Sequence, residues 1–156
     1  MRKQNLLVLC TGNSARSQMA EGFFRKYGAD RFTAYSAGTE PKGMNPLSVE
    51  AMKEVGIDLS QARSKHLKEY LGILPIAVVV IVCHDADQKC PAIWPGARLR
   101  LFWPFEDPAA AQGSHEEKLA RFRVVRDQIE ARIKEWLDSD EGWSLHPKAS
   151  RKRAQV

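Results

Sequence analysis

The segment Ile76–Val82 is a continuous run of small and β-branched apolar residues, IAVVVIV. A strand that is apolar at every position has to be covered on both faces, which is typical of the centre of a parallel sheet. Shorter apolar segments predict three more strands, at Asn5–Leu9, Phe32–Ala37 and Arg98–Trp103. The central run therefore favours folds in which helices enclose a parallel sheet.

Helical patterns separate and follow these strands. Apolar spacing predicts a helix over Ala15–Tyr27, and Asn45 followed by Pro46 marks the start of a second helix that Gly56 is expected to end. The capping-box pattern SHEE at positions 114–117 precedes an apolar stripe that runs to Trp136. We therefore predict an α/β fold, a single-domain three-layer sandwich whose four-stranded parallel sheet has helices on both faces. We expect this domain to span residues 1–137 and residues 138–156 to form a polar, basic C-terminal tail.

The composition argues against several classes of protein. The 156 residues suit one domain with a sizeable core. Part of the net charge of +5 lies in the tail, so the body is nearly neutral and no nucleic-acid partner is expected. No apolar stretch approaches the ~20 residues that span a bilayer, and the N-terminus does not resemble a signal peptide. We therefore expect a cytoplasmic protein without a membrane partner, whose three cysteines are inert core residues, metal ligands or reactive thiols.

Residues 10–17, CTGNSARS, directly follow the first predicted strand. Ligands of such folds bind beyond the carboxyl ends of the strands, where Cys10 stands. The loop N–H groups and the start of the next helix would form a nest for a tetrahedral oxyanion, with Arg16 gripping two of its oxygens. Gly12 permits a tight turn, and Asn13 tolerates an unusual backbone conformation. The predicted substrate-binding residues are Thr11, Gly12, Asn13, Ser14, Ala15, Arg16 and Ser17.

Cys10 is the candidate nucleophile. In an electropositive nest the pKa of a cysteine thiol can fall by several units, which would make Cys10 a thiolate aimed at the central atom of the anion. Thr11 and Ser17 would donate hydrogen bonds to its sulfur. The alternative is a buried structural cysteine beside an unrelated arginine, but the order of strand, loop and helix favours the nucleophile.

Cys83 and Cys90 flank the segment CHDADQKC after the central strand. Cys83 ends that strand, at the same edge of the sheet as Cys10. Cys90 lies about two helical turns further on, so a Cys83–Cys90 disulfide would require an intervening helix to unwind. The alternatives are two unremarkable cysteines or a metal site that includes His84, although the spacing matches no zinc motif.

Asp107 follows the fourth predicted strand, again at the edge that carries Cys10. A carboxyl group there can protonate a departing oxygen, which makes Asp107 a candidate general acid. The alternative is an aspartate that merely favours a turn before Pro108.

The segment CTGNSARSQMAEG resembles the phosphate-binding loop of the low-molecular-weight protein tyrosine phosphatase superfamily, and it is most similar to the thioredoxin-coupled arsenate reductases of that fold. The resemblance covers about residues 4–137 and includes YSAGTEPKGMNPLSVEAMKEVGIDLS, VCHDADQKCP, FWPFEDPAAAQG and FRVVRDQIEARI. One position departs from the family pattern, because Ala15 stands where a second loop cysteine is usual. Without this second loop cysteine, the loop lacks a thiol that could form an unwanted disulfide with Cys10.

The resemblance implies reduction of arsenate to arsenite. Cys10 would attack arsenate held by the loop and Arg16, Asp107 would help water leave, and Cys83 would then attack Cys10 and release arsenite. Cys90 would take over the bond as a Cys83–Cys90 disulfide that thioredoxin reduces, with glutaredoxin as the alternative donor. Phosphate or sulfate would compete as oxyanions, and no tightly bound cofactor is expected.

Two other functions use parts of the same pattern. A phosphatase acting on phosphotyrosine or phosphoarginine would need the loop and Asp107 but no Cys83–Cys90 pair. Tyrosine phosphatases of the family carry tyrosines where AAA stands at positions 109–111. An oxyanion sensor without enzyme activity would need neither the thiolate nor the redox pair.

The resemblance also bears on a potassium site near the loop. Arsenate reductases of this type often bind the ion through residues that match Asn13, Glu21 and Ser36, together with an aspartate. Lys65 stands where that aspartate would be. Its ammonium either replaces the ion and neutralises Glu21 or points into water, and no bound metal is expected.

Overall fold

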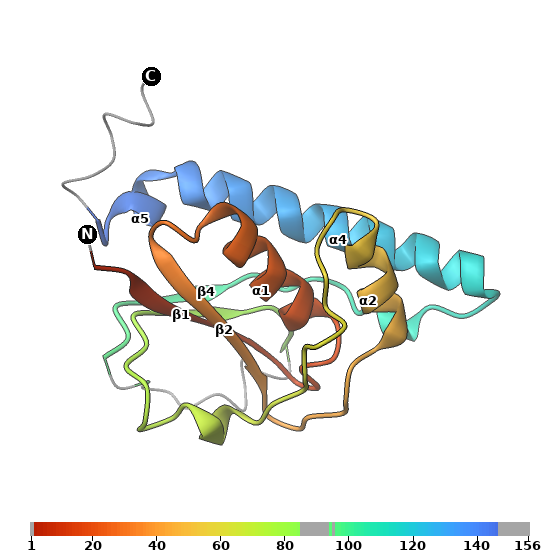
Figure 1. Cartoon of the computed structure of the whole chain (residues 1–156), viewed down its shortest axis with the longest axis horizontal. Coiled ribbons are helices and arrows are strands. Elements are labelled where there is room, and N and C mark those ends of the chain that lie inside the picture. Colours follow the sequence, from red (N-terminus) through yellow and green to blue (C-terminus); the bar gives the residue numbers. More distant parts are fainter. Residues whose placement is uncertain (1, 85–93, 95, 147–156) are drawn as a thin grey trace.

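A computed structural model describes residues 2–84, 94 and 96–146 and contains one four-stranded sheet (Figure 1). The strands are β1 (Gln4–Cys10), β2 (Phe32–Gly38), β3 (Val78–Ile81) and β4 (Leu99–Phe102), in the spatial order β2-β1-β3-β4. Every neighbouring pair is parallel, and β3 is buried at each position, as the run of β-branched residues requires. The predicted α/β domain with a four-stranded parallel sheet is confirmed.

Two helices begin where the sequence predicts, although α2 (Pro46–Lys53) ends before the expected stop at Gly56. The described helices are α1 (Arg16–Tyr27), α2 (Pro46–Lys53), α4 (His115–Asp138) and α5 (Asp140–Trp143), with short 3-10 turns η1 (Leu67–Glu69) and η2 (Pro108–Ala110). The Asn45 side chain caps α2 by accepting from the Leu47 N–H at 2.9 Å, and Ser114 and Glu117 form the predicted capping box of α4. No helix in this described part of the chain is long and apolar enough to cross a membrane.

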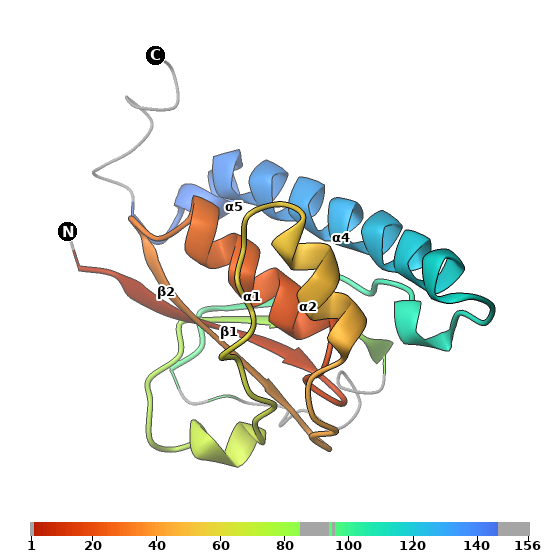
Figure 2. The same ribbon diagram turned by 45° about the vertical axis from the view of Figure 1, so that its right-hand side comes forward.

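The two faces of the sheet are covered differently (Figure 2). On one face α1 and α4 pack side by side, with fully buried Phe24 in edge contact with Trp136 at 6.2 Å between ring centroids. Phe32 of β2 contacts the same tryptophan. Tyr35 alternates to the opposite face, where its ring lies 5.2 Å from that of Tyr70, just after η1. One face of the sheet is thus covered by α1 and α4, and the segment around η1 packs on the opposite face.

The chain after α4 also belongs to the packed part of the protein. Leu145 and His146 are buried, and the Arg31 guanidinium donates to the carbonyl oxygens of Leu137 and Gly142 at 2.8 and 3.1 Å. The described domain therefore continues to residue 146, past the predicted boundary at 137, because α5 folds back onto the body. The remaining tail, residues 147–156, lies outside the described residues.

Glu54 joins the end of α2 to α4. Its carboxylate accepts hydrogen bonds from Arg123 at 2.7 Å and from Arg126 at 2.8 Å. These contacts, with the Arg123 hydrogen bond first, lower the pKa of Glu54 from 4.5 to about 2. A depressed pKa means that the carboxylate stabilises the fold above pH 4.5 and loses this effect as the pH falls toward 2.

We expect Glu54→Gln to be less stable than the wild type at pH 7, with the difference shrinking as the pH falls below about 4.5. Urea unfolding at a series of pH values measures this difference. Glu135→Gln, on the exposed face of α4, is the matched control and should follow the wild type throughout. A Glu54→Gln deficit that is the same at pH 2 and pH 7 would contradict the assignment.

Candidate active site

The loop between β1 and α1 lies at the carboxyl edge of the sheet. β1 ends at Cys10, α1 begins at Arg16, and Asn13 in between has a positive φ of 46°. The loop borders a cavity of about 220 Å³ that is lined by Cys10, Thr11, Gly12, Ser14, Ala15, Arg16, Lys42, Asp107 and Ala109. Three predicted catalytic residues, Cys10, Arg16 and Asp107, therefore share one cavity. Asn13 and Ser17 are buried and do not line it.

Buried side chains hold the loop in its shape. The Asn13 amide donates to Ser17 Oγ at 2.8 Å and accepts at Oδ1 from Gln18 Nε2 and from the Lys65 N–H, at 3.0 and 2.9 Å. Ser64 Oγ donates to the Asn13 carbonyl at 3.0 Å. This network explains how Asn13 sustains a left-handed conformation, as predicted for that residue.

Two carbonyls of the loop are bonded to the chain that follows β2. The Glu40 N–H donates to the Thr11 carbonyl at 2.8 Å, and the Lys42 N–H donates to the Gly12 carbonyl at 3.0 Å. In a trans peptide the N–H points opposite to the C=O, so the N–H of Gly12, which lines the cavity, is turned away from the chain after β2. This arrangement suits an anion. It needs glycine at position 38, where a Cβ would lie 2.5 Å from the Thr11 carbonyl oxygen.

The thiols of Cys10 and Cys83 are both buried and interact with each other. The hydrogen bond with Cys83 and then burial raise the pKa of Cys10, and together they outweigh Arg16 and the Thr11 N–H, which lower it. The neighbouring thiol and desolvation thus oppose the lowering of the Cys10 pKa that the nest was predicted to cause.

Thr11 acts on the Cys10 thiol through its backbone N–H, but its hydroxyl and Ser17 have other partners. The Thr11 N–H donates to Cys83 Sγ at 3.1 Å, and Thr11 Oγ1 lies 3.3 Å from the same sulfur. Ser17 Oγ accepts from Asn13. Thr11 therefore contacts both thiols, and Ser17 supports the loop.

Arg16 and Asp107 lie together at the mouth of the cavity. Arg16 Nη1 donates to the Phe105 carbonyl at 2.9 Å, and Nη2 lies 3.9 Å from Asp107 Oδ2. Asp107 is half exposed and caps η2 by accepting from the Ala109 N–H at 2.9 Å. Neighbouring Glu106 is paired with Arg121 instead. Asp107 is thus the carboxyl group that can reach a ligand in the cavity.

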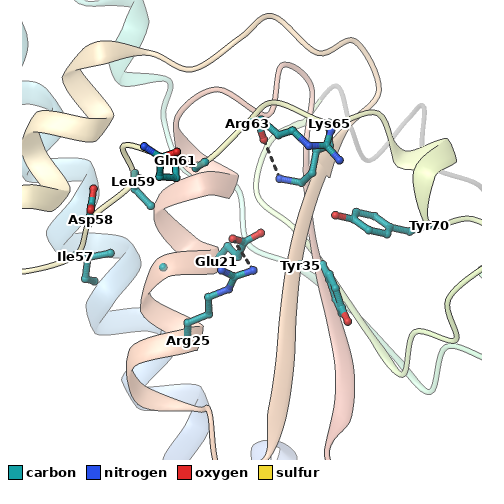
Figure 3. A pocket seen from close by; sticks show the side chains of 12 residues that line it. Glu21, Arg25, Tyr35, Ile57, Asp58, Leu59, Gln61, Arg63, Lys65 and Tyr70 are labelled. Atoms are coloured by element: carbon teal, nitrogen blue, oxygen red, sulfur yellow. Dashed lines mark hydrogen bonds and ion pairs between the residues drawn. The ribbon is translucent and has the colours of Figure 1, made fainter.

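Lys65 is buried and lines a cavity of about 430 Å³ together with Glu21 and Arg25 (Figure 3). Its ammonium donates to the Arg63 carbonyl at 2.9 Å and to Ser36 Oγ at 3.4 Å, so protein oxygens hold it in place. Burial lowers the pKa of Lys65. Glu21 is buried nearby, but its ion pair is with Arg25 at 3.3 Å. Lys65 therefore contacts one predicted ion ligand, Ser36, and contacts a second, Asn13, through its backbone N–H.

Sequence reasoning missed several residues of this site. Lys42 lines the cavity, and Gln18 and Ser64 support the loop. The sequence contained one signal for Lys42, because Lys42 closely follows β2. The last residue of β2, Gly38, pairs with Cys10 in the sheet. Cys90 lies outside the described residues, as does any metal site that would include it. Among the residues that are described, no group of three or more His, Cys, Asp or Glu side chains could hold a metal ion.

Comparisons with known proteins agree with this geometry. The family model for low molecular weight phosphotyrosine protein phosphatase matches residues 5–146. The arsenate reductase of Bacillus subtilis is 49% identical over 140 residues, 89% of this chain and 99% of that protein. The arsenate reductase of Halalkalibacterium halodurans is 48% identical, with the same coverage. A solved structure of an arsenate reductase in the oxidized state has a TM-score of 0.72 at 30% identity, covering 85% of this chain and 95% of that one.

Proposed function

We propose that this chain, which belongs to the low molecular weight phosphotyrosine protein phosphatase family, is an arsenate reductase. The observation that carries the proposal is a second buried thiol, Cys83, whose sulfur accepts from the Thr11 N–H of the loop at 3.1 Å and interacts with the Cys10 thiol. Hydrolysis of a phosphate ester needs one thiol, whereas reduction of an oxyanion needs two electrons, which two thiols supply. The relatives described above are named for the same activity.

In the first step Cys10 attacks the arsenic atom of a bound arsenate. Arg16 and the loop N–H groups hold the anion, and a sulfur–arsenic bond forms as an arsenic–oxygen bond breaks. The raised pKa of Cys10 means that its proton leaves as the nucleophile forms. That proton and the arsenate hydroxyl depart together as water, with Asp107 delivering the proton.

In the second step Cys83 attacks the Cys10 sulfur. A Cys10–Cys83 disulfide forms, and arsenic takes the electron pair of the broken sulfur–arsenic bond and leaves as arsenite. The Thr11 N–H and hydroxyl lie on Cys83 Sγ at 3.1 and 3.3 Å, where they would stabilise its thiolate. The interaction between the two thiols favours this attack.

In the third step Cys90 attacks Cys83 and moves the disulfide to Cys83–Cys90. Thioredoxin, in the cytoplasm, would reduce this disulfide and restore the three thiols. The enzyme would hold no tightly bound cofactor, and phosphate and sulfate would compete with arsenate for the loop.

The decisive assay is NADPH consumption with thioredoxin and thioredoxin reductase, with and without arsenate, alongside direct measurement of arsenite. We expect arsenate-dependent consumption with one arsenite released per NADPH. Hydrolysis of a small aryl phosphate, measured in parallel, reports the phosphatase alternative. Efficient hydrolysis of the aryl phosphate without arsenate-dependent NADPH consumption would indicate that the protein is a phosphatase and not a reductase.

Lys65 would act as a built-in cation in place of a potassium ion. The support is its buried ammonium on the oxygens of Ser36 and Arg63, directly behind Asn13. Wild-type activity and melting temperature should then be nearly equal in sodium and potassium salts of the same ionic strength. Lys65→Asp should create a preference for potassium in both measurements.

The control for this prediction is Lys68→Asp, which changes an exposed lysine three residues away. Lys68→Asp should have the activity of the wild type, and its activity and melting temperature should also be nearly equal in sodium and potassium salts. A wild-type protein that potassium clearly stabilises more than sodium would contradict the role of Lys65.

A further inference from the structure

We propose that Lys42 binds the substrate oxyanion and makes the cavity prefer doubly charged over singly charged tetrahedral anions. The proposal deepens the proposed function, because it concerns the anion that the same cavity would hold. Lys42 is neither part of the loop nor one of the residues that the sequence singled out.

The backbone fixes Lys42 against the loop. After β2 the chain runs beside residues 10–14, and the Lys42 N–H donates to the Gly12 carbonyl at 3.0 Å. The Glu40 N–H makes a similar bond to Thr11 at 2.8 Å. The base of the lysine side chain is therefore positioned by the element that shapes the nest.

The aliphatic part of the Lys42 side chain packs against Gly12. A Cβ added at Gly12 would lie 3.3 Å from Lys42 Cδ, slightly closer than ordinary van der Waals contact, and 3.4 Å from Lys42 Cγ. Gly12 has no positive φ, so here the glycine serves the close approach of the lysine rather than a left-handed turn. Beyond this contact, Lys42 lines the cavity together with Cys10 and Arg16.

The charges of the cavity give this lysine a role. Arg16 lies 3.9 Å from the Asp107 carboxylate, which lines the same cavity and opposes part of the attraction of Arg16 for an anion. Lys42 pairs with no carboxylate among the described residues, so its charge is available to a ligand. Because Coulomb attraction scales with ligand charge, Lys42 favours a dianion about twice as strongly in free energy as a monoanion.

The test compares sulfate, a tetrahedral dianion, with perchlorate, a tetrahedral monoanion. Protection of Cys10 from iodoacetamide, followed by mass spectrometry, gives the Kd of each anion in this cavity. Lys42→Met keeps most of the apolar stem and removes the charge. We expect the Kd of sulfate to rise about 5- to 20-fold and that of perchlorate only about 2- to 4-fold. The sulfate effect should shrink between about 0.1 and 0.5 M sodium chloride because salt screens the charge.

Two further variants separate charge from structure. Lys42→Arg should keep sulfate binding close to the wild type, and Lys53→Met, which removes an exposed lysine of α2, should change neither Kd. An unchanged sulfate Kd in Lys42→Met would overturn the proposal. Equal increases in the Kd of sulfate and of perchlorate would also overturn it, because they would indicate a structural effect and not an effect of charge.

The outcome is separable from that of the proposed function. Anions that fail to protect Cys10 in the wild type would overturn both the role of Lys42 and the oxyanion site. A selective loss of sulfate binding in a protein that does not reduce arsenate would support Lys42 and reject the reductase.

Discussion

Replacing Cys10 by serine is expected to lower arsenate reduction, and any hydrolysis of an aryl phosphate, by at least about 1,000-fold. A serine hydroxyl is scarcely ionised at neutral pH, and its oxygen cannot form the disulfide that releases arsenite. Arsenite release and aryl phosphate turnover are measured on the same preparation. The variant should fold normally, because Cys10 and serine differ little in volume at this buried position.

Binding provides the control for the Cys10→Ser variant. Arg16 and the loop N–H groups remain, so calorimetry should still detect sulfate. Substantial arsenite release by Cys10→Ser would remove Cys10 from the role of nucleophile, whereas loss of both sulfate binding and folding would make serine unsuitable and require Cys10→Ala. In the wild type, alkylation of Cys10 should accelerate as the pH rises, because the pKa of its thiol is raised by Cys83 and by burial.

Local patterns were sufficient to predict the elements of the fold. The β-branched run became the buried strand β3, the Asn45-Pro46 pair became the start of α2, and the capping box opened α4. Each of these signals depends on residues within a few positions of each other. The sequence prediction failed at α5, because Leu145 and His146 are buried through contacts with chain segments far away in the sequence, including Arg31.

The same distinction between short-range signals and long-range contacts holds for the candidate active site. The topology of a parallel sheet brings the ends of β1, β3 and β4 to one edge, and so it brought Cys10, Cys83 and Asp107 together. Topology does not determine which atom a side chain meets. The bond from Thr11 to Cys83 Sγ, the raised pKa of Cys10 and the burial of Lys65 all depend on contacts across more than 50 positions.

Because position 15 is an alanine, the described residues offer one candidate thiol to attack the arsenic-bound Cys10. The alanine is buried in the wall of the cavity, where the family usually has a cysteine. Among the described residues, Cys83 is then the one thiol besides Cys10. A disulfide formed by Cys10 during turnover should therefore be with Cys83, and this makes the relay open to a direct test.

Cys90→Ser is expected to abolish thioredoxin-driven turnover after a single cycle. Cys10, Arg16 and Asp107 remain, and Cys83 can still resolve the arsenic-bound Cys10, so about one equivalent of arsenite should appear. The relay then stops at a Cys10–Cys83 disulfide between two sulfurs that are almost fully buried, at 4% and 3% residue exposure. A protein reductant reaches such a bond poorly, because exchange requires attack on an accessible sulfur. Arsenite per enzyme and disulfide mapping by mass spectrometry measure the result.

Cys83→Ser is the matched control, since it stops the relay one step earlier. Without the resolving thiol the arsenic should stay on Cys10, so less than about a tenth of an equivalent of arsenite should be released and no Cys10 disulfide should form. Both variants should hydrolyse a small aryl phosphate at least as well as the wild type, because hydrolysis uses only Cys10, Arg16 and Asp107. In Cys83→Ser the Cys10 pKa should also fall, since its largest raising contact is removed. Undiminished multiple turnover by Cys90→Ser would show that the Cys10–Cys83 disulfide is reduced directly, and that the third cysteine is no part of the relay.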